Sequence, residues 1–235
     1  MMCKGENMYQ HTSAFVAFCR KELSFQLGTI YGYKSLSACI IDCVYSLRAQ
    51  YYSTTVPVVE RYAETYMNGD RFAANDTIAD LIRHIKDAGG TNHFATDILK
   101  NKQQSGGVLK ADVCLQLAQY LGYLHINTIE DFQNFESPEL LEIVIRAVKG
   151  MGDAGTNYLF MLAGDPNRCK PDVHIHHCVK DACNEDISNE ECQILFTEAV
   201  AELKAEYPEL TVAKLDGIIW TKYQSEQYSK RGKRK

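Results

Sequence analysis

Two short stretches of the chain contain residues whose types and spacing could do chemistry. Residues 147–156 place Gly150 and Gly152 between two stretches with helical periodicity. Glycines at such a turn let bare backbone N–H groups, and the N-terminus of the next helix, face a phosphate. Residues 170–175 place Asp172 directly after Pro171, where it would open a further helix. The positive end of a helix favours an ionised, fixed carboxylate, and such a group can do acid–base chemistry.

Each of these two features also has a purely structural explanation. Gly150-Met151-Gly152 could be a helix C-cap followed by a turn, with no ligand. Asp172 could serve only as the cap of its own helix. A functional role is favoured by the spacing of the two features, because Asp172 follows Gly152 by twenty residues.

The pair of motifs resembles the helix-hairpin-helix DNA glycosylase superfamily, in particular its endonuclease III-like members. Gly150-Met151-Gly152 matches the family's Gly-hydrophobic-Gly hairpin, and Asp172-Val173-His174-Ile175 matches its Asp-x-His-hydrophobic motif. A weaker resemblance extends to Ala38–Thr55, which looks like the family's base-pocket region, and to Lys110-Ala111, where a helix resumes. The resemblance covers about residues 36–225, and its specific part is 147–178.

Departures from the family pattern narrow the implied chemistry. Bifunctional members carry a lysine after the hairpin that forms a Schiff base with the sugar, but Ala154 stands at that position. The resemblance therefore implies a monofunctional enzyme with weak or absent lyase activity. His177 replaces an arginine of many relatives. The spacing of Cys169, Cys178, Cys183 and Cys192 fits neither the family's iron–sulfur loop nor a zinc knuckle.

The resemblance also implies roles for particular residues. Asp172 would be the catalytic carboxylate, which stabilises an oxocarbenium-like sugar and orients or deprotonates a water. The residues expected to grip DNA phosphate are Lys149, Gly150, Met151, Gly152, Ala154 and Gly155, with Lys170 suited to a similar contact. A base pocket is expected at Asp42, Tyr45, Ser46 and Arg48, and a wedge loop at Gln103 and Gln104 within 101–107. The alternative for the base-pocket segment is an amphipathic helix whose tyrosines pack in the core. The alternative for 101–107 is an ordinary exposed connector.

The expected partner is double-stranded DNA with one base extruded, and the protein would bind it as a monomer. No cofactor is expected, except for a possible monovalent cation at the hairpin. The setting would be the nucleoid of a bacterial or phage-like system, in DNA repair or in defence against modified foreign DNA. Two other functions stay open. One is a non-catalytic helix-hairpin-helix DNA-binding protein, and the other is a metal-dependent enzyme using the cluster His174–Cys178.

Composition and charge set limits on these functions. The 235 residues are 46% hydrophobic, without a long apolar run or an apolar N-terminal signal, so we expect a cytoplasmic protein. Nine cysteines suit a reducing compartment. The formal net charge of −5 argues against binding to DNA. The acidic residues, however, gather in 181–209, which holds nine of them and one basic residue, Lys204. The basic end, 226–235, could be a disordered or cloning-derived tail or a DNA-contacting arm.

Apolar periodicity and capping signals predict an all-α fold. Ser137-Pro138-Glu139, for example, has the N-cap and N1 proline of a helix start. The predicted helices are 11–27, 36–50, 53–68, 76–88, 91–101, 108–122, 128–134, 137–148, 153–164, 171–183, 188–206 and 211–224. The resemblance divides them into a central lobe, 36–165, with the helix-hairpin-helix motif at about 138–163, and a second lobe, 1–35 plus 166–225. It places an active-site cleft between the lobes.

Overall fold

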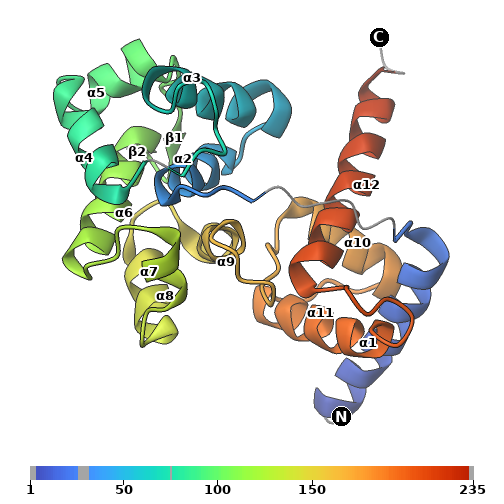
Figure 1. The fold of residues 1–235 in the computed structure, drawn as a ribbon. Helices are drawn as coiled ribbons and strands as arrows, with labels where there is room; N and C mark the ends of the chain where they lie inside the picture. Colours follow the sequence, from blue (N-terminus) through green and yellow to red (C-terminus); the bar gives the residue numbers. More distant parts are fainter. Residues whose placement is uncertain (1–3, 26–31, 75, 233–235) are drawn as a thin grey trace. The chain divides into compact units, whose positions relative to one another are not determined.

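The computed structural model describes residues 4–25, 32–74 and 76–232, and their regular structure is almost entirely helical (Figure 1). These residues form two compact units. One unit takes its described residues from Met1–Thr29 and Pro166–Lys235, and the other takes them from Ile30–Asp165. Each unit has a buried apolar core of its own. The predicted helical class is therefore confirmed, with one small β-hairpin as an exception.

The unit formed by Ile30–Asp165 is organised around α2, Leu36–Ser46. Every residue of α2 is buried, because the helix is apolar on nearly all sides and packs against α3, α4, α6 and α9. Its start is fixed by Ser35, whose side chain accepts the N–H of Ala38. The other elements of this unit are η1 Tyr51–Thr55, α3 Val56–Tyr66, α4 Ile78–Asp87, α5 Thr91–His93, η2 Phe94–Ile98, β1 Gln104–Ser105, β2 Val108–Leu109, α6 Lys110–Tyr123, α7 Ile129–Gln133, α8 Pro138–Ala147 and α9 Gly152–Leu162.

Strands β1 and β2 form an antiparallel hairpin that the sequence analysis did not predict. Gly106 and Gly107 both have positive φ, +58° and +78°, as a tight two-residue hairpin turn requires. Two-residue strands are too short to produce the alternation by which a strand is recognised in sequence. The hairpin ends where α6 begins, at Lys110.

Two predicted helices contain π-helical turns. The segment predicted as 53–68 consists of η1 followed by α3, with Pro57 in the first turn of α3. Proline has no N–H to donate to the preceding turn, so regular α-helical hydrogen bonding cannot run through this junction. The segment predicted as 91–101 is the short α5 followed by η2, where the N–H of Leu99 donates to Phe94 O at 2.9 Å.

The second unit is a bundle of α1 Lys4–Glu22, α10 Val173–Cys183, α11 Asn189–Leu203 and α12 Val212–Gly232. Helix α1 packs on α10 and α11, and α12 packs on the same two helices (Figure 1). Helix α11 begins with a capping box formed by Ser188 and Glu191. Helix α12 continues to Gly232, into the basic end 226–235, and residues 233–235 lie outside the described part.

Candidate active site

Asp172 lies at the N-cap of α10, at the end of the turn that enters this helix from Pro166. One carboxylate oxygen accepts the N–H groups of His174 at 2.8 Å and Ile175 at 3.3 Å. The side chain is half-buried, whereas the neighbouring Pro171 is buried and Val173 is exposed. The carboxylate is therefore held in one position at the positive end of the helix while part of it stays accessible.

His174 lies on the first turn of α10, next to this carboxylate. Burial is the main cause that lowers its pKa, and the charges of His177 and Lys170 add to the effect, while Asp172 opposes it. The imidazole is therefore mainly neutral at neutral pH. Its ring meets the Trp220 ring of α12 edge to face, with centroids 6.2 Å apart. The unit that contains Asp172 thus also contains the Trp220 ring and the neutral His174 imidazole, which are in contact with each other.

Asp216, on α12, is the residue of this site that the sequence analysis missed. Its side chain is 5% exposed, and one oxygen accepts the N–H of Lys170 at 2.8 Å. The pKa of Asp216 is raised to about 8, mainly by burial and in addition by the negative charge of Asp172, while Lys170 lowers it through its N–H and its charge. A signal was present in the sequence, because Asp216 interrupts the buried apolar stripe formed by Val212, Leu215 and Ile219.

These groups form a pair of carboxyls in unlike surroundings. Asp172 accepts two backbone N–H groups at a helix N-terminus and is partly exposed. Asp216 is buried and is mostly protonated at neutral pH. Two carboxyl groups whose surroundings differ in this way are typical of acid–base sites. The turn 170–172 together with α10 and α12 is accordingly the best candidate active site in this unit.

The other unit contains the predicted hairpin, which joins α8 to α9. Gly150 has φ of +108°, and a Cβ atom at this position would lie 2.9 Å from Ser105 O. The Ser105 hydroxyl donates to Gly150 O at 2.6 Å. Gly150 is thus required for close packing against β1. Gly152 also has positive φ, +63°, but faces open space.

The six predicted phosphate-binding residues differ in how far they are exposed to solvent. Lys149 and Gly152 are exposed, and Gly150 and Ala154 are half-buried. Met151 supports the turn itself, since its side chain is buried and its N–H donates to Val148 O. Gly155 is buried on the far side of the first turn of α9, where it packs against Leu47 and Met151.

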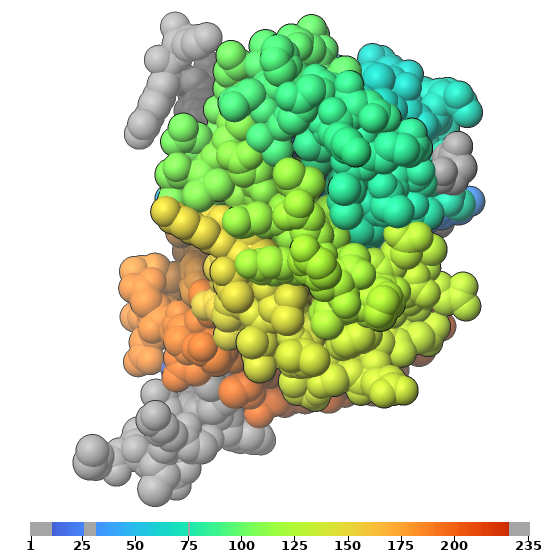
Figure 2. Space-filling view, turned by 90° about the vertical axis from the view of Figure 1, so that its left-hand side faces the viewer, coloured from blue at the N-terminus to red at the C-terminus, as the bar shows by residue number. Residues whose placement is uncertain are grey.

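The N-terminus of α9 has no side-chain cap, and the first N–H groups of an α-helix have no acceptor within the helix, which suits an anion. Two features of the same end oppose or limit anion binding. Asp153 adds a negative charge in the first turn, and it is paired with Arg146 at 3.3 Å. The helix that leads into the turn, α8, also exposes Leu140 and Ile143, whose apolar side chains offer an anion no hydrogen bond; α8 has the yellow-green to yellow colours in Figure 2.

The predicted base-pocket residues lie largely inside the same unit. Asp42 is fully buried, and its carboxylate accepts hydroxyl hydrogen bonds from Tyr33 at 2.7 Å, Tyr51 at 2.8 Å and Tyr158 at 2.9 Å. The three tyrosines come from different segments and are half-buried, so their rings form a partly exposed aromatic cluster around the carboxylate. Asp42 therefore organises tyrosines and does not itself face an open pocket.

The remaining predicted pocket and wedge residues do not gather at one place. Tyr45 is fully buried, and the Ser46 hydroxyl donates to Cys43 O. Arg48 is exposed and has positive φ, +53°. Gln103 and Gln104 are exposed, so the predicted wedge loop is accessible, although Gln104 belongs to β1.

Lys110, the first residue of α6, is buried. Its ammonium group donates to Tyr45 O, Leu47 O and the side-chain oxygen of Gln103, at 2.8 to 3.0 Å. These bonds satisfy carbonyl groups at the C-terminal end of α2, which an α-helix leaves without partners. Lys110 therefore joins α2 to α6 and the loop before it, and does not contact solvent.

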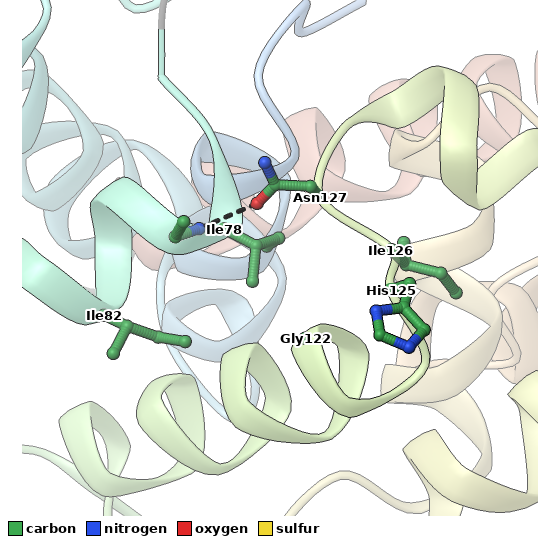
Figure 3. A pocket seen from close by; sticks show the side chains of 7 residues that line it. Ile78, Ile82, Gly122, His125, Ile126 and Asn127 are labelled. Atoms are coloured by element: carbon green, nitrogen blue, oxygen red, sulfur yellow. Dashed lines mark hydrogen bonds between the residues drawn. The ribbon is translucent and has the colours of Figure 1, made fainter.

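Other cavities and side-chain groups give weaker candidates. A shallow cavity of about 290 Å³ lies between α4 and α6, lined mainly by Ile78, Ile82, Gly122 and His125 (Figure 3). The Asn127 side chain at its edge is bonded to the N–H of Ala79. His125 is the one titratable side chain in this lining. Within the described residues, no set of three or more His, Cys, Asp or Glu side chains is arranged to hold a metal ion.

Comparison with known proteins assigns the chain to one family. The family model described as "Domain of unknown function (DUF8548)" matches residues 13–225, which is most of the chain, so the chain belongs to this family. Comparisons with curated proteins and with solved structures return no match. In the part of the chain that the structure describes, no helix combines the length and apolar content needed to cross a membrane.

Proposed function

We propose that the chain is a monofunctional DNA glycosylase that hydrolyses the N-glycosidic bond of a flipped, damaged or modified base. The observation that carries this proposal is the position of Asp172. Its carboxylate is fixed by two backbone N–H groups at the start of α10, remains partly accessible, and has His174 and the buried Asp216 beside it. A fixed carboxylate of this kind suits a reaction that passes through a cationic sugar.

In the proposed reaction, the bond between C1′ of the sugar and the nitrogen of the base breaks, and the base leaves with the bonding electron pair. The sugar becomes oxocarbenium-like, and the negative charge of Asp172 stabilises it. A water oxygen then bonds to C1′ and gives one proton to Asp172, while the departing base takes a proton from solvent. Asp172 afterwards returns its proton to solvent. Because Ala154 has no amine, no Schiff base forms at that position.

The α8–α9 turn would hold the DNA backbone in this proposal. Uncapped N–H groups of α9 and the exposed Lys149 are suited to a phosphate, with Gly152 permitting close approach. A monovalent cation at the turn, as well as the DNA partner itself, is part of the proposal. Because the turn and Asp172 belong to different units, the proposal requires both units to act on the same DNA molecule, with the active site in a cleft between them.

The tyrosine cluster around Asp42 is our candidate for the base-binding surface. Tyr51 and Tyr158 are half-buried with their hydroxyls fixed by Asp42, and Tyr52 is 59% exposed next to Tyr51. Aromatic rings held in this way can stack on an extruded base without a large loss of side-chain entropy. In this proposal the cluster contacts the extruded base and not the phosphate backbone.

A second candidate function is a non-catalytic helix-hairpin-helix DNA-binding protein. The specific observation in its favour is that one Asp172 oxygen already accepts two N–H groups as the cap of α10. Capping by itself explains an aspartate at this position. The formal net charge of −5 also suits weak, transient contact with DNA better than tight binding.

Base release from a panel of damaged and modified DNAs, measured by mass spectrometry, separates the two functions. Wild-type protein is compared with Asp172→Asn at equal folding and DNA affinity. The glycosylase proposal predicts release of at least one base by the wild type and not by the variant. Salt-sensitive binding without release by either protein, over a broad panel, would favour the non-catalytic function.

A further inference from the structure

Asp216 occupies an unusual position for a carboxyl group that serves only the fold. It lies on α12, is 5% exposed, and among the described residues its one hydrogen-bond donor is the N–H of Lys170. A buried carboxylate with a single neutral donor is poorly stabilised, whereas a neutral carboxyl is tolerated there. Replacement of the charge by an apolar side chain would be expected if only packing mattered at this position.

The Lys170 peptide connects Asp216 to Asp172. Its N–H donates to Asp216, and its carbonyl oxygen accepts the N–H of Asp172 at 2.6 Å. Asp216 thus fixes the turn 170–172 directly before α10, and this turn determines where the Asp172 carboxylate lies at the helix N-terminus. Movement of the Lys170 peptide would change the position of Asp172.

Three titratable groups face Asp216. Asp172 disfavours its ionisation through like charge, Lys170 favours it, and the Cys169 thiol is close enough for Asp216 to raise the pKa of that thiol. Burial is the largest influence and acts in the same direction as Asp172, which brings the pKa of Asp216 to about 8. At neutral pH Asp216 is therefore mostly neutral.

We infer that Asp216 is a positioning residue that acts in its neutral form: through the Lys170 peptide it holds the Asp172 carboxylate in place for the proposed reaction. The inference rests on the glycosylase function proposed above. Ionisation of Asp216 places a second negative charge beside Asp172 inside the bundle, and their repulsion displaces the turn. Base release is therefore expected to fall at alkaline pH.

The pH profile of base release tests this role with two variants of Asp216. In the wild type, the single-turnover rate is expected to fall about tenfold per pH unit above pH 8, as for loss of one essential proton. Asp216→Asn resembles the neutral carboxyl and is expected to keep the rate at pH 7 within about threefold while losing this alkaline decline. Asp216→Leu cannot accept the Lys170 N–H and is expected to lose at least about tenfold at every pH.

Asp76→Asn is the matched control, because Asp76 is also a buried carboxyl with a pKa raised by burial, to about 6, but belongs to the other unit. This control is expected to keep the alkaline decline of the wild type. An alkaline decline in Asp216→Asn equal to that of the wild type would overturn the inference. A folded Asp216→Leu with wild-type rates would overturn it as well.

A measurement that needs no activity keeps this inference distinct from the proposed function. The backbone amide NMR signals of Lys170 and Asp172 are expected to titrate with a midpoint near pH 8 in the wild type. The midpoint should fall in Asp172→Asn, which removes the like charge, and the titration should vanish in Asp216→Asn. Titration without base release would contradict only the glycosylase proposal. If the amide signals do not titrate, the positioning role is contradicted whether or not base is released.

Discussion

At the scale of single residues, Asp172 caps α10 and its side chain is also partly exposed. Substitution can separate the capping role from the charge of this side chain. Asparagine is nearly as good an N-cap as aspartate but carries no charge, whereas alanine provides no cap. The cap can therefore be kept while the charge is removed. This separation is what makes the site open to direct tests.

Removal of the Asp172 cap is expected to destabilise the protein measurably. Asp172→Ala leaves the N–H groups of His174 and Ile175 without their acceptor, and should cost about 1 kcal/mol of unfolding free energy. Asp172→Asn should cost no more than about 0.5 kcal/mol, because the amide oxygen can accept the same bonds. Urea denaturation at pH 7 measures both. Equal losses for the two variants would mean that the carboxylate does more for stability than capping α10.

Asp42 provides the contrasting case of a carboxylate with a structural role inside a unit. Asp42→Ala removes the acceptor of three tyrosine hydroxyls, and we expect a loss of about 3 kcal/mol or more of unfolding free energy. Tyr33→Phe removes a single donor from the same cluster and should cost about 1 kcal/mol. Both are measured by chemical denaturation. A loss for Asp42→Ala no larger than for Tyr33→Phe would show that the hydroxyls find other partners.

At the scale of elements, the α8–α9 turn contains two glycines with different structural requirements. Gly150 is at φ of +108° and in close contact with Ser105, whereas Gly152 is at +63° with no atom near its missing side chain. A positive φ disfavours alanine at both positions, but steric exclusion acts only at the first. The turn is thus tied to β1 on one side and open on the other.

Alanine at these two positions is expected to give unequal losses of stability. Gly152→Ala should cost about 1 kcal/mol, the usual penalty of an L-residue in the left-handed region. Gly150→Ala adds a contact of 2.9 Å between Cβ and a backbone oxygen, so the loss should exceed that of Gly152→Ala by about 2 kcal/mol. The midpoints of urea unfolding give the comparison. If Gly150→Ala were the milder change, the packing of this turn on β1 would be contradicted.

Elements with strong local signals could be predicted from the sequence. The helix predicted at 137–148 is α8 Pro138–Ala147, and the one predicted at 128–134 is α7 Ile129–Gln133, because Ser137 and Thr128 are caps that act within four residues. The β-hairpin could not be predicted, since its strands are only two residues long. The burial of Lys110 could not be predicted either, since its partners Tyr45 and Leu47 lie far away in the chain. The same limit applies to Asp216, which becomes part of the site only through the packing of α12 on α10.

At the scale of the whole molecule, charge limits how the protein can bind DNA. The formal net charge is −5, and the predicted contact to phosphate uses backbone N–H groups with few lysines. Backbone amides contribute little to the release of counterions, which depends on the number of phosphate charges that basic side chains neutralise. DNA binding should therefore depend less on salt than for a strongly basic protein.

The salt dependence of DNA affinity tests this expectation. With two or three phosphates neutralised, the slope of log K against log salt concentration should be about −2 to −3. Lys149→Ala should make the slope shallower by about 1 and weaken binding equally for all DNA sequences. Lys86→Ala is the control, since Lys86 is exposed on α4 of the same unit and away from the turn. Fluorescence anisotropy gives the affinities, and an unchanged slope in Lys149→Ala would remove this residue from the DNA contact.

The central claim, that Asp172 is the carboxylate of a base-releasing reaction, is tested most directly by the single-turnover rate of base release. Wild type and Asp172→Asn are compared on the DNA that releases most base, at protein concentrations that saturate binding. We expect the rate to fall by about a hundredfold or more, with folding and DNA affinity preserved, because asparagine keeps the cap but cannot stabilise a cation or accept a proton. A variant that releases base as fast as the wild type would contradict the claim.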